Sequence, residues 1–107
     1  MNLLFVCSRN KWRSPTAEAI YKNYSGINVK SAGTEPAARI KLNSRFIEWA
    51  DLIFVMEKKH KQRMRENFPI ETERKEIVVL DIPDEYKYMD KELIEELKSK
   101  IDEYIES

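Results

Sequence analysis

The sequence contains a single cysteine, Cys7, and a single histidine, His60, among its 107 residues. One cysteine cannot build a disulfide framework, which excludes the small secreted scaffolds stapled by disulfides and favours a reducing compartment. One cysteine and one histidine also fall short of the ligands that an ordinary zinc site needs. We therefore expect a cytoplasmic protein with no metal site.

Long hydrophobic runs are absent as well. The first apolar run, residues 3–6, is too short for the core of a signal peptide, and no basic segment precedes it. No stretch stays apolar over the roughly 20 residues that a transmembrane helix requires. We therefore expect no membrane partner.

Neither sign of charge is in excess, because 19 Lys plus Arg balance 19 Asp plus Glu. The charges are nevertheless unevenly placed: residues 1–75 have 15 basic and 8 acidic side chains, whereas residues 76–107 have 4 and 11. A basic first part would attract phosphorylated substrates, although most of these charges are also typical of solvated helix faces. The basic run at residues 58–63 is typical of such a face too, so we expect no nucleic-acid partner.

Four short apolar runs predict strands buried on both faces, at residues 3–6, 27–29, 52–56 and 77–80. Between and after them, apolar residues recur at helical spacing over residues 17–24, 46–50, 60–68 and 93–105. Asp90 is placed to cap the last helix. The order βαβαβαβα predicts an α/β fold of three layers, α/β/α, around a four-stranded parallel sheet, in one domain spanning residues 1–107.

The stretch from Cys7 to Pro15 lies where the first predicted strand ends and the first helix begins. Ser14 can cap that helix, and Pro15 suits its first turn. A loop in front of a helix N-terminus directs backbone N–H groups inward, where they bind an anion such as phosphate with help from the helix dipole. The same positive field favours thiolate over thiol, and Arg13 offers a planar fork for two phosphate oxygens. We predict that Cys7 is a nucleophile beneath a phosphoryl group.

The loop residues that we expect to bind phosphate are Ser8, Arg9, Asn10, Lys11, Trp12, Arg13 and Ser14. A plainer interpretation remains for the cysteine, because a lone Cys at the end of an apolar strand is ordinarily a small buried packing residue. The strand before the loop and the helix after it favour the chemical interpretation, since they are the context that the mechanism needs. His60, on an apolar helix face, is interpreted as a packing residue.

Val6-Cys7, Asn10 and the run from Arg13 to Glu18 resemble the phosphate loop of the low-molecular-weight protein tyrosine phosphatases. In that family the loop reads Cys, five residues, Arg, Ser, with Asn at the fourth position. Later segments are similar too: residues 31–34 to the turn after the second strand, 50–57 to the third strand, and 82–86 to the loop that carries the general acid. The resemblance implies a phosphotyrosine-phosphatase-I-like fold and no cofactor.

The sequence also departs from the family pattern. Thr34 runs almost directly into Ala38-Arg39, so a helix and part of the cleft wall are expected to be missing. Arg9 stands where the loop usually has glycine, and Trp12 where many members have a second cysteine. Residues 36–39 replace a His-x-Ala-Arg segment whose histidine is buried in the family.

The resemblance implies hydrolysis of phosphate monoesters, with protein phosphotyrosine as the substrate and a small phosphate ester as the alternative. Cys7 would attack phosphorus and form a phosphocysteine, while Arg13 and the loop amides would stabilise the equatorial oxygens. Asp84 is the candidate that protonates the leaving oxygen, although it is also a typical turn residue after proline. Asp81, just past the fourth strand, competes for the same role.

Other functions remain open from the residues alone. A phosphocysteine carrier, such as a sugar-transport IIB protein, has a similar size and fold but needs neither Arg13 nor a leaving-group acid. A non-catalytic module that binds phosphorylated ligands needs the loop but not Asp84. Similar arsenate reductases use additional cysteines, which this sequence lacks. Tyr86 and Tyr88 can either stack against an aromatic substrate or pack under their loop.

Overall fold

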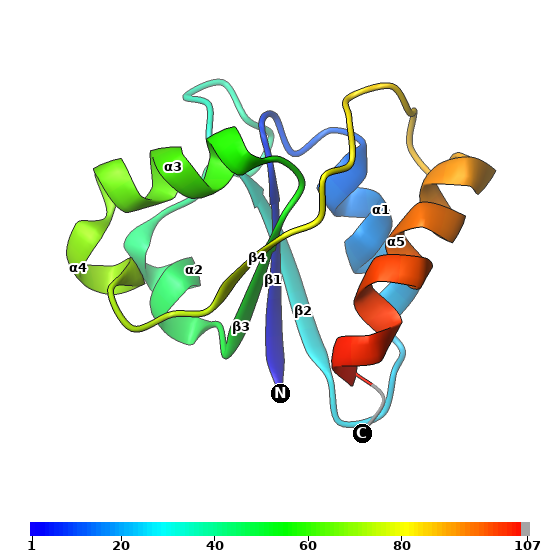
Figure 1. Cartoon of the computed structure of the whole chain (residues 1–107), viewed down its shortest axis with the longest axis horizontal. Coiled ribbons are helices and arrows are strands. Elements are labelled where there is room, and N and C mark those ends of the chain that lie inside the picture. Colours follow the sequence, from blue (N-terminus) through cyan, green and yellow to red (C-terminus); the bar gives the residue numbers. More distant parts are fainter. Residues whose placement is uncertain (106–107) are drawn as a thin grey trace.

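A computed structural model describes residues 1–105, and four parallel strands form its centre (Figure 1). In chain order the strands are β1 (Asn2–Cys7), β2 (Asn28–Gly33), β3 (Leu52–Val55) and β4 (Ile77–Val79). They are arranged in the sheet as β2-β1-β3-β4, so β1 has a neighbour on each side. The carboxyl ends of parallel strands meet at one edge of the sheet, and Cys7 lies at that edge on a central strand.

Helices cover both faces of the sheet (Figure 1). One face is covered by α1 (Arg13–Tyr21) and α5 (Lys91–Ile105), and the other by α2 (Ser44–Trp49), α3 (Lys58–Asn67) and α4 (Pro69–Thr72). The predicted α/β/α layers and parallel sheet are therefore confirmed. The sequence did not predict α4, a single turn that begins at a proline, where the missing N–H costs nothing.

The alternation of side chains along β1 decides on which face of the sheet the cysteine lies. Leu3, Phe5 and Cys7 belong to the apolar cluster beneath α1 and α5, whereas Leu4 and Val6 belong to the cluster on the opposite face. Successive side chains of a strand point to opposite faces, so one run of five apolar residues supplies both cores. Cys7 thus emerges on the face where α1 begins.

Helices α2 and α5 have side-chain caps, the second as predicted for Asp90, whereas α1 has none. The Asn43 side chain accepts a hydrogen bond from the Phe46 N–H at 3.0 Å, and Asp90 Oδ1 accepts one from the Glu92 N–H at 2.9 Å. The expectation that Ser14 caps α1 is wrong, because α1 already begins at Arg13 and has no side-chain cap. Ser14 lies inside the first turn, where its hydroxyl is available for another partner.

Residues 34–43 connect β2 to α2 without a helix. Within this connection, Lys41 forms an isolated β-bridge with Gly33 at the end of β2. Gly33 packs against the loop between β1 and α1, where a Cβ atom would come within 2.6 Å of the Ser8 carbonyl oxygen. Real Cβ atoms do not approach so closely, so glycine is required for the two segments to pack. No helix among residues 1–105 is both long and apolar enough to cross a membrane.

Candidate active site

The loop between β1 and α1 has its carbonyl groups turned outward. The carbonyl oxygens of Cys7, Ser8 and Arg9 accept backbone hydrogen bonds from Thr34, Glu35 and Arg39 at 2.9, 2.9 and 3.0 Å. Within residues 1–105, no amide N–H of residues 8–12 donates to a protein acceptor. Because the carbonyls are held on the outside, the free N–H groups are available to an anion in front of α1.

A chain of hydrogen bonds ends on the Cys7 sulfur. The carboxylate of Glu18 can only accept, so the Ser31 hydroxyl donates to it at 2.5 Å, and Ser31 Oγ in turn accepts from Asn10 Nδ2 at 2.9 Å. The same Asn10 amide nitrogen donates to Ser14 Oγ at 2.9 Å. The Ser14 hydroxyl proton is therefore directed to Cys7 Sγ, 3.0 Å away. A donor aimed at the sulfur stabilises the thiolate.

Asn10 contributes to this series of hydrogen bonds through its backbone conformation as well as its side chain. Its φ of 55° lies in the left-handed region, which asparagine tolerates better than most residues. That conformation turns the side chain inward, and the residue is completely buried. Asn10 therefore holds the loop in shape by its backbone conformation and by the two hydrogen bonds of its amide nitrogen.

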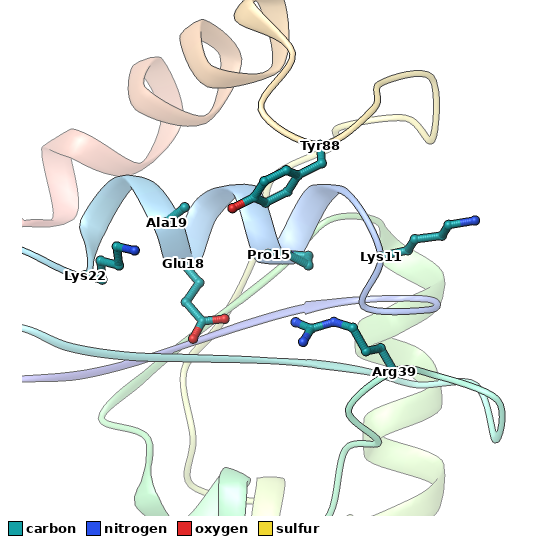
Figure 2. Close-up of a pocket in the computed structure, with 7 residues that line it drawn as sticks. All are labelled: Lys11, Pro15, Glu18, Ala19, Lys22, Arg39 and Tyr88. Atoms are coloured by element: carbon teal, nitrogen blue, oxygen red, sulfur yellow. The ribbon is translucent and has the colours of Figure 1, made fainter.

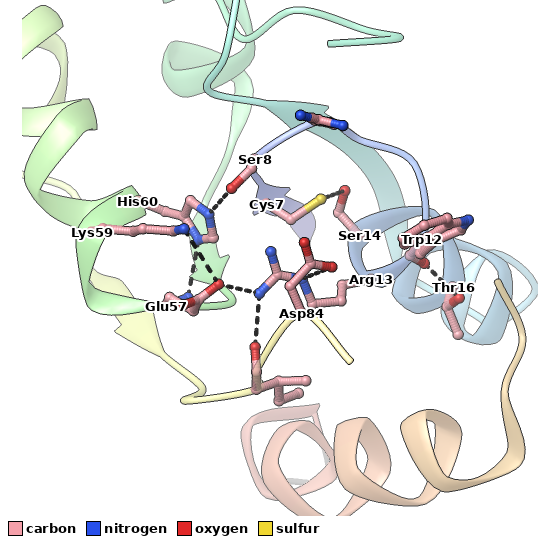
Figure 3. A network of polar contacts seen from close by, with 12 residues as sticks. Cys7, Ser8, Trp12, Arg13, Ser14, Thr16, Glu57, Lys59, His60 and Asp84 are labelled. Carbon is pink, nitrogen blue, oxygen red and sulfur yellow. Dashed lines mark hydrogen bonds and ion pairs between the residues drawn. The ribbon is translucent and has the colours of Figure 1, made fainter. Parts of the chain in front are cut away.

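Arg13 is almost fully buried, and its guanidinium is fixed from two directions (Figure 3). Nη1 donates to the Glu57 carboxylate and, at 2.8 Å, to the Ile82 carbonyl oxygen. Burial acts to raise the pKa of Glu57, but the hydrogen bond and charge of Arg13 outweigh burial and hold the pKa below its usual value. The guanidinium is thereby oriented before any substrate binds.

The two candidate acids lie in different places. Asp84 Oδ1 is 3.7 Å from Arg13 Nε, and Asp84 lines the same depression as Cys7 (Figure 3). Asp81 instead lines a separate hollow beside α3, with Lys58, Lys61 and Arg65. The geometry therefore favours Asp84 as the proton donor over Asp81.

His60 is buried on α3, and both of its ring nitrogens are hydrogen-bonded (Figure 3). The Glu57 backbone N–H donates to Nδ1 at 3.0 Å, so Nδ1 has no proton and the neutral ring has its proton on Nε2. Nε2 then donates to Ser8 Oγ at 2.8 Å. Burial, followed by the charge of Arg13, lowers the pKa of His60 from 6.5 to about 4, although Glu57 opposes the shift. His60 is thus more than a packing residue.

We expect His60 to make the folded state sensitive to mild acid. Its pKa is lower in the folded chain than in the unfolded one, so the unfolded chain binds the extra proton as the pH falls from 6.5 to about 4. The free energy of unfolding therefore has its full contribution from neutral His60 above pH 6.5, and it falls by about 3 kcal/mol as the pH drops to about 4. Denaturant unfolding of the wild type and of His60→Gln at pH 7 and pH 4 measures this difference. Equal losses in both proteins would contradict it.

The depression above Cys7 is small, about 40 Å³, and its rim is cationic. Its lining consists of Cys7, Ser8, Arg9, Lys11, Trp12, Arg13 and Asp84. Arg9 pairs with Glu35 at 3.2 Å but remains largely exposed, and the Lys11 ammonium lies 4.7 Å from the centre of the Trp12 ring. Within residues 1–105, no cluster of three or more His, Cys, Asp or Glu side chains could hold a metal ion.

A second depression of about 430 Å³ adjoins the first along α1 (Figure 2). It is lined by Lys11, Pro15, Glu18, Ala19, Lys22, Arg39 and Tyr88. Lys11 belongs to both depressions. Of the two tyrosines, Tyr86 packs against the core, and Tyr88 lies over α1 rather than above Cys7.

Sequence reasoning assigned no role to Glu57, Glu18 and Ser31, and it missed the hydrogen bonds of His60. Glu57 carried a signal, because it lies two positions past the end of β3, the strand that neighbours β1, and the ends of adjacent parallel strands meet. Glu18 and Ser31 carried none. Their contacts join residues 13 positions apart, which no local pattern reveals.

Comparison with known proteins agrees with the fold and the loop. The model of the low molecular weight phosphotyrosine protein phosphatases matches residues 2–48. The protein-arginine-phosphatase of Bacillus subtilis is 30% identical, with 64% of this chain and 63% of the relative covered. A low molecular weight protein tyrosine phosphatase from T. tengcongensis has a similar structure, with a TM-score of 0.76 and 25% identity over 99% of this chain and 98% of that chain.

The chain is therefore similar to the low-molecular-weight protein tyrosine phosphatases, in sequence over residues 2–48 and in fold over nearly its whole length. An arginine phosphatase from Geobacillus stearothermophilus is similar to the same degree, with a TM-score of 0.76 and 25% identity over 98% of this chain and 90% of that chain. The match to the B. subtilis relative spans a little under two thirds of its length, 63%. Both tyrosine and arginine phosphatases are thus found among the proteins that this chain is similar to.

Proposed function

We propose that this chain is a cysteine-dependent phosphatase that hydrolyses phosphate monoesters on proteins through a phosphocysteine intermediate. The observation that carries the proposal is the loop before α1, whose amide N–H groups have no protein acceptor within residues 1–105 and which joins Cys7 to the fixed guanidinium of Arg13. This arrangement binds a phosphoryl group and keeps a nucleophile beneath it. A reactive thiol of this kind fits a reducing compartment, so we propose that the protein acts in the cytoplasm.

The reaction follows from the positions of three side chains. Cys7 thiolate attacks phosphorus as the bond to the leaving oxygen breaks, and the Arg13 fork with the loop amides stabilises the equatorial oxygens. Asp84, at the open side of the depression, gives its proton to the leaving oxygen. The same carboxylate then takes a proton from water, which attacks the phosphocysteine and releases phosphate.

The rim of the depression favours an aryl ester over an N-phosphorylated guanidine as substrate. Phosphoarginine releases a guanidinium cation, which the charges of Arg9 and Lys11 would repel. A tyrosine ring is uncharged, and it can lie against the indole of Trp12. We therefore propose protein phosphotyrosine as the substrate.

The second depression favours an acidic segment next to the phosphorylated residue. Lys11, Lys22 and Arg39 supply three cations around it, against the single carboxylate of Glu18, which already accepts from Ser31. A polypeptide that enters the first depression would pass over the second, because Lys11 borders both. Acidic flanking residues would complement this surface.

We expect phosphotyrosine peptides to be hydrolysed with at least about tenfold higher kcat/KM than phosphoarginine or phosphoserine peptides of the same sequence, a difference of about 1.4 kcal/mol in transition-state binding. Phosphate release from each peptide measures this preference. Faster hydrolysis of the phosphoarginine peptide would reverse the substrate assignment, and release from none of them would overturn the proposed activity.

The same assay tests the second depression. A phosphotyrosine peptide with flanking glutamates should be hydrolysed a few-fold faster than one with flanking lysines, since each surface charge contact is worth about 0.2–1 kcal/mol. Lys22→Ala should reduce that ratio. Lys98→Ala removes another exposed lysine, on α5 and outside the depression, and should leave the ratio unchanged.

A further inference from the structure

We propose that His60 is a positioning residue that holds the Ser8 hydroxyl as a hydrogen-bond donor to the bound phosphoryl group. The phosphate site would then have a side-chain donor in addition to the amides of its loop and Arg13. The inference rests on the proposed function, because it concerns the same anion. It assigns the only histidine of the sequence to that site, although the histidine lies on α3, 52 positions away from Ser8.

The orientation of the His60 ring follows from the start of α3. Glu57 precedes that helix, and its side chain accepts from the His60 backbone while its own N–H donates to His60 Nδ1. This reciprocal capping box fixes the ring, and it leaves Nε2 as the nitrogen with the proton. Nε2 is 2.8 Å from Ser8 Oγ, so the histidine is the donor and the serine oxygen is the acceptor.

The Ser8 hydroxyl proton must therefore point away from His60. A serine hydroxyl has a single proton, and within residues 1–105 no protein acceptor binds it. Ser8 borders both the depression that contains Cys7 and the neighbouring hollow that contains His60 (Figure 3). Its carbonyl oxygen is tied to the Glu35 N–H at 2.9 Å, which fixes the backbone. With His60 on one side, the open direction for the proton is the depression above Cys7.

The charges around the ring suit a neutral donor. Arg13 and Glu57 face His60 from the site, and Lys59 and Arg63 face it from α3. The cations disfavour a second proton on the ring, so the hydrogen-bond direction persists at neutral pH. Glu57 also binds Arg13 through its carboxylate, so this one residue at the start of α3 orients both Arg13 and, through His60, Ser8.

Inorganic phosphate is the probe for the test, because its binding needs no turnover. Titration of the intact protein by NMR or calorimetry gives its affinity. We expect Ser8→Ala to weaken phosphate binding about tenfold, as for a hydrogen bond to a charged group. His60→Leu should weaken it to the same extent, and the double variant no further, because both changes remove the same donor. His60→Gln retains a neutral N–H donor and should restore most of the affinity.

Unchanged phosphate affinity in Ser8→Ala would overturn the proposal. The proposal would also be overturned if His60→Leu lowered phosphate affinity as much in the Ser8→Ala background as in the wild type. The histidine would then act on the fold and not through the Ser8 hydroxyl. Should His60→Leu fail to fold, ¹⁵N chemical shifts of the His60 ring in the wild type at pH 7 test the proposal instead. They should show the proton on Nε2, and a proton on Nδ1 would contradict the proposed hydrogen bond to Ser8. Phosphate binding without hydrolysis would contradict the proposed function but leave this inference standing.

Discussion

Cys7→Ser is expected to abolish phosphatase activity while leaving the fold and phosphate binding intact. Serine has the same shape, and it retains a contact with the Ser14 hydroxyl, which lies 3.0 Å from the sulfur in the wild type. Its hydroxyl is not ionised near neutral pH, so the nucleophile is lost although the anion site remains. Loss of an enzyme's nucleophile costs about 10⁴–10⁶-fold in kcat. Release of phosphate from an aryl phosphate measures the loss.

Two further measurements distinguish loss of the nucleophile from loss of the anion site. Titration with inorganic phosphate should show that Cys7→Ser still binds the anion, because the loop amides, Arg13 and the Ser8 hydroxyl remain as donors. Alkylation of wild-type Cys7 by iodoacetate should inactivate the protein, and phosphate should protect against it. Residual activity of Cys7→Ser within tenfold of the wild type would show that another group attacks phosphorus.

Asp84→Asn is expected to lower turnover by an amount that depends on the leaving group. An aryl ester with an activated, electron-poor leaving group departs without a proton, whereas phosphotyrosine and alkyl esters need one. Loss of a general acid costs about 10²–10⁴-fold, and this loss should appear for the poor leaving groups only. A series of substituted phenyl phosphates measures the dependence of kcat on leaving-group basicity, which should be steeper in Asp84→Asn than in the wild type.

Asp81→Asn is the matched control for this experiment. Asp81 has a φ of 55°, and asparagine tolerates that conformation, so the change removes a charge with little backbone strain. It should leave the leaving-group dependence unaltered, because Asp81 faces the hollow beside α3. A steep dependence in Asp81→Asn would reverse the two roles. If neither variant shows it, the chain carries or binds phosphate instead of hydrolysing its esters.

The sequence by itself determined the fold class and the place of the loop. The apolar runs are short and continuous, and that pattern fits strands buried on both faces of a parallel sheet. Each run is separated from the next by enough chain for a crossover helix, so the connections follow as well. A cysteine at the end of the first strand, with arginine six residues on at the start of a helix, needs only local geometry to form an anion site. Those features were therefore predictable from nearby residues alone.

The tertiary structure alone decided which distant groups complete the site. Asp81 and Asp84 are three positions apart on one loop, and only the path of that loop brings Asp84 to Arg13. The path of the chain also brings Glu57 to Arg13 and His60 to Ser8, over 44 and 52 positions. Ser14 was misassigned as a cap because its sequence context fits that role, whereas its hydroxyl binds Cys7 in the folded chain. Hydrogen bonds act over about 3 Å, so sequence periodicity can place a residue on a face but cannot choose its partner.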